Sequence, residues 1–156
     1  MKRGNPSSDT RYKALLQLLR AADTLWNRSH AFFACWNLSP SQFNVLNLLL
    51  DPADGLSQIE LGRLLITHRS NVTGLIDRLE KRGLVRRRDA VKDRRAYRVG
   101  LTAEGRKLVH KILPNYYQMA EEVWGGFPAE RAEQMTADLE RLCANMEKLM
   151  ARKGDP

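Results

Sequence analysis

The chain has 156 residues, 43% of them hydrophobic, and its 26 Lys and Arg against 18 Asp and Glu give a net charge of +8. This length suits one domain, or one compact lobe with a helical extension, and the apolar content is enough for a packed core. There is no long uncharged apolar run and no apolar signal region behind the charged N-terminus, so the sequence predicts neither a membrane span nor export. Cys35 and Cys143 are far apart and lack metal-ligand spacing, which favours a cytoplasmic protein with reduced thiols and no metal or other cofactor.

Two helices are predicted in the first third of the chain. A continuous apolar stripe at helical spacing predicts a long helix over residues 9 to about 35. The second helix should run from 40 to about 50, because Ser39 and Gln42 have the spacing of a capping box and Pro40 suits the first helical position. A turn rich in Asp, Pro and Gly follows.

A second pair of helices is predicted close together. Ser57 and Glu60 have the spacing of another capping box, which opens the third helix. Its expected core contacts are Leu61, Leu64 and Leu65. Only residues 66–68 separate this helix from the fourth, and so short a gap predicts the sharp angle of a helix-turn-helix.

The fourth helix carries the clearest pattern in the sequence. Its apolar stripe, at i, i+3, i+4 and i+7, consists of Val72, Leu75, Ile76 and Leu79. The opposite face carries short polar and basic side chains, namely Arg69, Ser70, Asn71, Thr73 and Asp77. Gly83 ends the helix, and two basic strands are predicted at 84–88 and 96–101, joined by a charged loop at 89–95. Helix, helix and basic hairpin predict a winged helix-turn-helix lobe.

The positive charge is concentrated in this lobe. Residues 63–98 contain twelve Lys and Arg against four Asp and Glu, a net of +8, so the rest of the chain is balanced at fourteen against fourteen. A local basic excess on a helix and hairpin indicates a polyanionic partner. The alternative is a solvated basic face on an ordinary domain.

The last third of the chain predicts two more helices. Thr102 can cap a fifth helix that reaches about Trp124, with Val123 on its buried side and Pro114 kinking it. A sixth helix should reach about residue 152, and Cys143 beside its apolar seam is expected to be buried. The seam has heptad spacing and consists of Met135, Leu139, Leu142, Met146 and Leu149.

The outer helices carry more apolar surface than a small winged lobe can cover. We therefore expect a homodimer, formed through these helices by Leu15, Leu19, Met135, Leu139, Leu142 and Met146. Packing within one chain is the alternative. The domain organisation expected is one domain over 1–156, mainly α with a small antiparallel wing. In it, about 39–101 form the DNA-binding lobe, and about 9–35 and 102–152 form the helical dimerisation region.

Four segments resemble the multiple antibiotic resistance regulator (MarR) family of bacterial transcription factors, at 38–46, 57–61, 71–85 and 93–105. The last is similar to the family's wing signature, Asp-x-Arg-x-x-x-Leu/Val-x-Leu-Thr-x-x-Gly. It matches at Asp93, Arg95, Val99, Leu101, Thr102 and Gly105. The resemblance implies a homodimer on a near-palindromic DNA site, often a repressor that a small aromatic compound releases. Gly74 departs from the bulkier polar residue common there in the family.

The candidate DNA contacts follow from the chemistry of bases and phosphates. On the recognition helix they are Arg69, Ser70, Asn71, Thr73 and Arg78. Arg can form two hydrogen bonds with guanine and Asn two with adenine, whereas Ser and Thr can bond bases or phosphates. Arg78 and Arg63 are expected to bind phosphates. On the wing they are Lys92, Asp93, Arg94 and Arg95. Here a guanidinium can enter the minor groove, while Asp93 orients a neighbouring Arg.

An aromatic cluster near the end of the first helix contains Trp26, His30, Phe33 and Trp36. The resemblance places an effector cleft there, and such residues suit a planar organic ligand. A plain dimer core is the alternative, and neither cysteine is expected to sense redox state.

Catalysis has no motif in this sequence, so no enzyme is expected. The alternatives to an effector-controlled repressor are a ligand-insensitive or architectural DNA-binding factor and, in another class, a helical protein–protein adaptor.

Overall fold

The computed structural model describes residues 9–65, 72–90 and 93–153. The chain divides into two compact units, Met1–Lys111 and Ile112–Pro156. The first unit holds α1 to α4, a three-stranded sheet and the start of α5, and the second holds the rest of α5 and α6. Within the described ranges, none of the helices combines the length and the apolar character that crossing a membrane requires.

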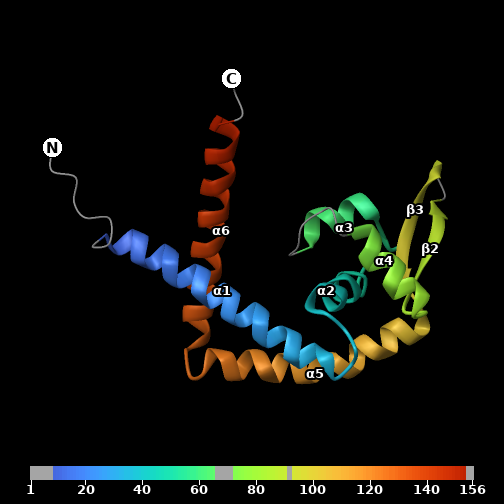
Figure 1. Ribbon diagram of the computed structural model, residues 1–156, viewed down its shortest axis with the longest axis horizontal. Coiled ribbons are helices and arrows are strands. Elements are labelled where there is room, and N and C mark those ends of the chain that lie inside the picture. Colours follow the sequence, from blue (N-terminus) through green and yellow to red (C-terminus); the bar gives the residue numbers. More distant parts are fainter. Residues whose placement is uncertain (1–8, 66–71, 91–92, 154–156) are drawn as a thin grey trace. The chain divides into compact units, whose positions relative to one another are not determined.

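The fold is mainly helical with a small antiparallel sheet, as predicted (Figure 1). In chain order the elements are α1 (Thr10–Ala34), α2 (Pro40–Leu48), β1 (Leu56–Ser57), α3 (Gln58–Leu64), α4 (Val72–Lys81), β2 (Val85–Ala90), β3 (Asp93–Leu101), α5 (Ala103–Trp124) and α6 (Ala129–Lys153). The strand order is β1-β3-β2, with β3 antiparallel to both neighbours. The predicted gap at 66–68 lies outside the described residues.

Both predicted capping boxes are confirmed. At α2 the Gln42 backbone N–H donates to Ser39 Oγ at 3.2 Å, and the Ser39 N–H donates to Gln42 Oε1 at 2.8 Å. At α3 the Glu60 N–H donates to Ser57 Oγ at 3.2 Å, and the Ser57 N–H donates to Glu60 Oε2 at 2.7 Å. Each cap stabilises its helix by about 1 kcal/mol and determines where the helix begins.

The core of the first unit is built around α4, whose four predicted apolar residues are all buried. This helix contacts α2, α3 and β2, and Figure 1 shows these elements grouped around it. The core side chains contributed by its neighbours include Phe43, Leu46, Leu61, Val85 and Val99. Burying a Leu or Ile side chain contributes about 1.5–3 kcal/mol, so the stripe fixes the rotation of α4 about its own axis.

The β-hairpin is longer than the sequence predicted. β2 and β3 pair as far as Asp89 with Tyr97 and Ala90 with Asp93, with an irregularity between Asp89 and Ala90. The predicted charged loop at 89–95 is therefore wrong, since most of it is strand. The sequence could not predict this extension, because a polar, arginine-rich segment shows no apolar alternation and forms a strand only through pairing with its neighbour.

Two further expectations need correction, and two others stay untested. Leu56 and Ser57 form the short strand β1 opposite Val99 and Arg98. The sequence did not predict this strand, because two residues are too few to show a periodic pattern. Leu64 is 53% exposed, since α3 buries the side that carries Leu61 and Leu65. Val123 is 56% exposed and Cys143 is exposed in the single chain, so their burial in the expected dimer stays a prediction.

Gly105 marks the closest approach between α5 and the end of the sheet. A Cβ at this position would lie 1.9 Å from the Leu84 carbonyl oxygen. We predict that Gly105→Ala lowers the free energy of unfolding by about 1–3 kcal/mol or more, because the backbone has to move apart. Urea unfolding followed by circular dichroism measures this. Gly100→Ala, whose added Cβ would meet nothing within 4 Å, is the control and should stay near wild type. Equal losses in the two variants would contradict the prediction.

Candidate nucleic-acid interface

The outward face of α4 follows from the burial of its stripe. Thr73 is exposed, and its hydroxyl accepts a hydrogen bond from Gln58 Nε2 at the start of α3. Arg78 is exposed five residues further along, and Arg63 is exposed near the end of α3. Three predicted contacts therefore lie on the surface of the helix-turn-helix, and α3 orients one of them.

The other predicted contacts are only partly described. Arg69, Ser70, Asn71 and Lys92 lie outside the described residues. Asp93, Arg94 and Arg95 belong to the first part of β3, and their side chains lie outside the described ones.

Arg87 joins the wing to the outward side of α4. Its guanidinium donates to Asp77 Oδ1 and Glu80 Oε2 on α4. Its backbone N–H donates to Glu80 Oε1 at 2.9 Å. Its guanidinium carbon also lies 5.6 Å from the centre of the Tyr97 ring on β3, a cation–π distance. These four residues form a clamp between the recognition helix and both strands of the wing.

The clamp has an electrostatic signature. The hydrogen bond to Asp77, and then the bond and charge of Glu80, raise the pKa of the Arg87 guanidinium, although its partial burial opposes them. Asp77 is 56% exposed but is engaged by Arg87. The sequence placed Asp77 on the outward face of the helix, which its exposure confirms, and the structure adds its bond to Arg87. Alternation along the strand, which puts Arg87 on the same face as buried Val85, is the signal that could have identified it.

Arg98 also forms structural contacts within the lobe. Its guanidinium donates to the carbonyl oxygens of Asp54 at 3.2 Å and Gly55 at 2.7 Å, and lies 3.4 Å from Glu60 Oε2. Hydrogen bonds from the Ser57 backbone and hydroxyl, with a smaller effect of the Arg98 charge, hold the pKa of Glu60 below its usual value. Arg98 thus holds the turn before β1 against β3.

Arg82, just after α4, bonds the turn that follows α1. Its guanidinium donates to the carbonyl oxygens of Asn37 at 2.6 Å and Trp36 at 3.2 Å. Asn37 has φ 55°, a left-handed conformation that Asn tolerates better than most residues. Part of the basic excess is therefore used internally. The exposed cations that remain among the described side chains of the lobe include Arg63, Lys81, Arg86 and Arg88.

The predicted aromatic cluster divides into separate contacts. Trp26 and His30 meet edge to face with ring centroids 5.7 Å apart, and both are exposed. Phe33 is buried and stacks on Phe43 of α2 at 4.4 Å. Trp36 is half-buried and lies against Phe32, 5.2 Å away. Only Trp26 and His30 of the four are brought together as an exposed pair.

The predicted dimerisation residues lie mostly on the surface of the single chain. Leu15 and Leu19 on α1, and Met135, Leu142 and Met146 on α6, are between 45 and 59% exposed. Leu139 is half-buried. Apolar surface of this extent is unusual for helices that have no partner.

Among the described side chains, no group of three His, Cys, Asp or Glu is placed to hold a metal ion. Both cysteines are free and exposed.

A helix-turn-helix followed by a two-stranded basic wing defines the winged helix-turn-helix class. The family model described as the MarR family matches residues 36–96. The transcriptional repressor YetL of Bacillus subtilis (strain 168) is 34% identical over 116 residues, which cover 71% of this chain and 70% of YetL. The chain therefore belongs to the MarR family of transcriptional regulators.

Two solved structures resemble this chain along most of its length. CouR from Rhodococcus jostii RHA1, solved with p-coumaroyl-CoA, has 25% identity and a TM-score of 0.76, covering 89% of this chain and 94% of CouR. BpsR of Bordetella bronchiseptica, described by its regulation of DNA binding by 6-hydroxynicotinic acid, has 26% identity and a TM-score of 0.67. That match covers 81% of this chain and 98% of BpsR.

The clamp makes a prediction about stability. Arg87→Gln should lower the free energy of unfolding by about 1–3 kcal/mol, because two charge-assisted hydrogen bonds are lost from a side chain that is 23% exposed. Thermal or urea unfolding measures the loss. Arg86→Gln, on the neighbouring exposed side chain, should change it little.

A double-mutant cycle with Glu80→Gln provides the decisive comparison. The effects of Glu80→Gln and Arg87→Gln should fall short of additivity by about 0.5 kcal/mol or more. Simple additivity would mean that the two side chains do not interact in solution.

Proposed function

We propose that this MarR-family regulator is a repressor that binds double-stranded DNA sequence-specifically, as a homodimer on a near-palindromic operator in the cytoplasm. The observation that carries the proposal is the orientation of α4 in the lobe. Its apolar stripe is buried, so Thr73 and Arg78 face outward beside the basic wing. A recognition helix in this position suits the major groove, and the preceding helix supports it.

The roles proposed for the residues follow from their chemistry. Arg69, Asn71 and Thr73 would contact base edges, with Ser70 serving bases or phosphates, and Arg78 with Arg63 would hold phosphates. Gly74 offers no side chain, so one base contact common in the family is absent here. Arg94, Arg95 and Lys92 would meet the minor groove and its phosphates, with Asp93 orienting an arginine.

We further propose that a small, planar aromatic compound releases the DNA. CouR and BpsR support this in outline, since the first was solved with p-coumaroyl-CoA and the second responds to 6-hydroxynicotinic acid. On this chain the exposed pair Trp26 and His30 is the candidate contact. Phe33 and Trp36, the other two predicted pocket residues, form separate aromatic contacts with Phe43 and Phe32. Adding such compounds to a protein–DNA complex tests the proposal. A complex that no compound weakens would favour a ligand-insensitive factor.

The direct test of DNA binding is a fluorescence anisotropy titration of a random-sequence duplex at several salt concentrations. Cations on phosphates release counterions, so the logarithm of the affinity should fall linearly with the logarithm of the salt concentration. Absence of binding at low ionic strength would refute the proposal and favour a protein–protein adaptor.

Arg95→Ala tests the wing separately. It should weaken binding to specific and random duplexes alike and lower the salt slope by about 1, because one phosphate contact is lost without loss of base reading. Arg131→Ala removes an exposed cation from α6, outside the winged lobe, and should leave both quantities unchanged. If Arg95→Ala binds like wild type, the wing has no part in DNA binding.

Leu142→Glu tests the homodimer. A carboxylate in the middle of the α6 seam should convert the dimer to a monomer and weaken operator binding at least tenfold, because a monomer engages one half-site. Sedimentation equilibrium measures the first effect and anisotropy the second. Ala137→Glu lies on the opposite, exposed side of α6 and should remain a dimer. A dimer that persists in Leu142→Glu would place the interface elsewhere.

A further inference from the structure

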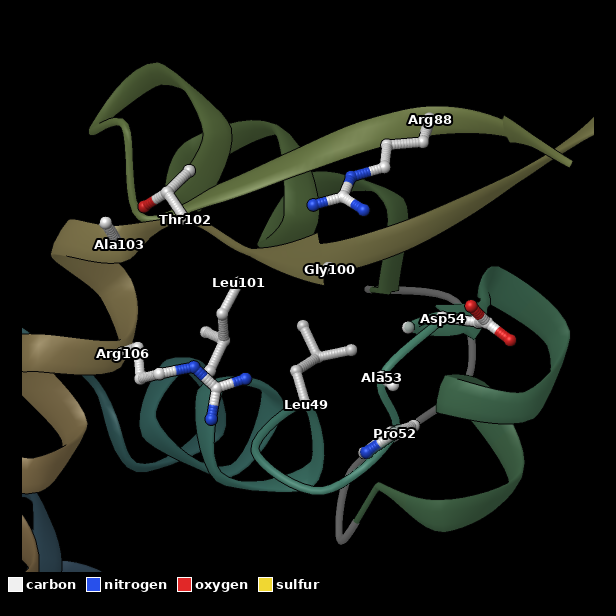
Figure 2. A pocket seen from close by; sticks show the side chains of 11 residues that line it. Leu49, Pro52, Ala53, Asp54, Arg88, Gly100, Leu101, Thr102, Ala103 and Arg106 are labelled. Carbon is white, nitrogen blue, oxygen red and sulfur yellow. The ribbon is translucent and has the colours of Figure 1, made fainter.

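A pocket of about 340 Å³ opens on the side of the winged lobe away from α4. It is bounded by the turn before β1, by β3 and by the first turn of α5 (Figure 2). Side chains alternate along a strand, so Arg88 projects from the sheet face opposite to that of Arg87, which faces α4. The pocket is therefore separate from the recognition helix and from the aromatic pair Trp26 and His30.

Two guanidinium groups from different elements enter this pocket. Figure 2 shows Arg88 of β2 above Gly100 and Arg106 of α5 beside Leu49, with their nitrogen atoms turned toward the space between them. Arg106 Nη1 donates to the Leu50 carbonyl oxygen at 3.1 Å, which orients its side chain. No described side chain forms an ion pair with Arg88. The Asp54 carboxylate at the rim points away from both cations in Figure 2.

The floor of the pocket is open because of Gly100, and the lining is partly polar and partly apolar. Leu49, Leu101 and Pro52 supply the apolar lining. A Cβ on Gly100 would meet nothing within 4 Å, so a side chain there would enter free space. Small-molecule sites are concave and combine apolar lining with a few polar groups, and about 340 Å³ suits a compact ligand.

We propose that this pocket binds a small organic anion, with its phosphate or carboxylate between Arg88 and Arg106 and its apolar body on the leucines. A planar guanidinium can donate two parallel hydrogen bonds to the oxygens of a phosphate or a carboxylate. Two guanidinium groups, from Arg88 and Arg106, favour a ligand group that carries two negative charges. A concave pocket with apolar residues in its lining favours a small molecule over a phosphate of the DNA backbone. A duplex presents its phosphates to a groove or an open surface and has no apolar body to place beneath them.

Phenyl phosphate is a suitable probe, since it combines a dianion with a compact ring. Isothermal titration of the full-length chain should show saturable binding, with amide chemical-shift changes in NMR spectra centred on Gly100 and Ala103. Arg88→Gln and Arg106→Gln should each weaken binding roughly tenfold. Gly100→Val should abolish binding while leaving the melting temperature near wild type, because the new side chain fills the floor. Benzyl alcohol, which lacks the charge, should not bind.

Arg86→Gln is the matched control, because Arg86 lies on the same face of β2 but outside the pocket. Phenyl phosphate should bind this variant as it binds wild type. Equal weakening in Arg86→Gln and Arg88→Gln would reveal general attraction to a basic face and overturn the proposal, as would the absence of saturable binding. A duplex that displaces phenyl phosphate, together with weakened duplex binding in Arg88→Gln, would assign these arginines to the DNA backbone and also overturn it.

Discussion

The structure depends on the burial of one side of α4. Val72, Leu75, Ile76 and Leu79 pack against α2, α3 and the sheet, and each contributes about 1.5–3 kcal/mol. Rotation of α4 about its axis would expose this stripe, so the direction of its polar face is set by the core. The residues available to a partner are thereby determined before any partner binds. Preorganisation of this kind lowers the ordering cost of recognition.

The wing is positioned by ionic contacts as well as by strand pairing. Arg87 binds Asp77 and Glu80 on α4, and Arg98 holds the turn before β1. Arg82 bonds carbonyl groups at the end of α1. The basic excess therefore has two uses. Some cations stabilise the lobe, and others remain exposed for polyanions, so net charge alone overstates the number available to DNA.

Local signals in the sequence predicted much of the fold. The apolar spacing of α4 and the two capping boxes act within a few residues, so the sequence alone shows them. Strand β1 pairs with a segment distant in the chain, and no local pattern reports it. The clamp at Arg87 had a local signal in the alternation of β2, but its acidic partners on α4 depend on how the strand packs on the helix. The same limit applies to Leu64, whose exposure is decided by which side of α3 packs. For the interface, the sequence predicted the exposure of Thr73, Asp77 and Arg78 but not the ion pair between Asp77 and Arg87.

The most direct measurement is the selection of bound sites from a random duplex library by the full-length protein. A recognition helix held outward on each of two protomers predicts enriched sequences with two inverted half-sites about one helical turn apart. A single unpaired half-site would contradict the two-fold arrangement. A library without enrichment would contradict the assignment of the α4 face to base recognition.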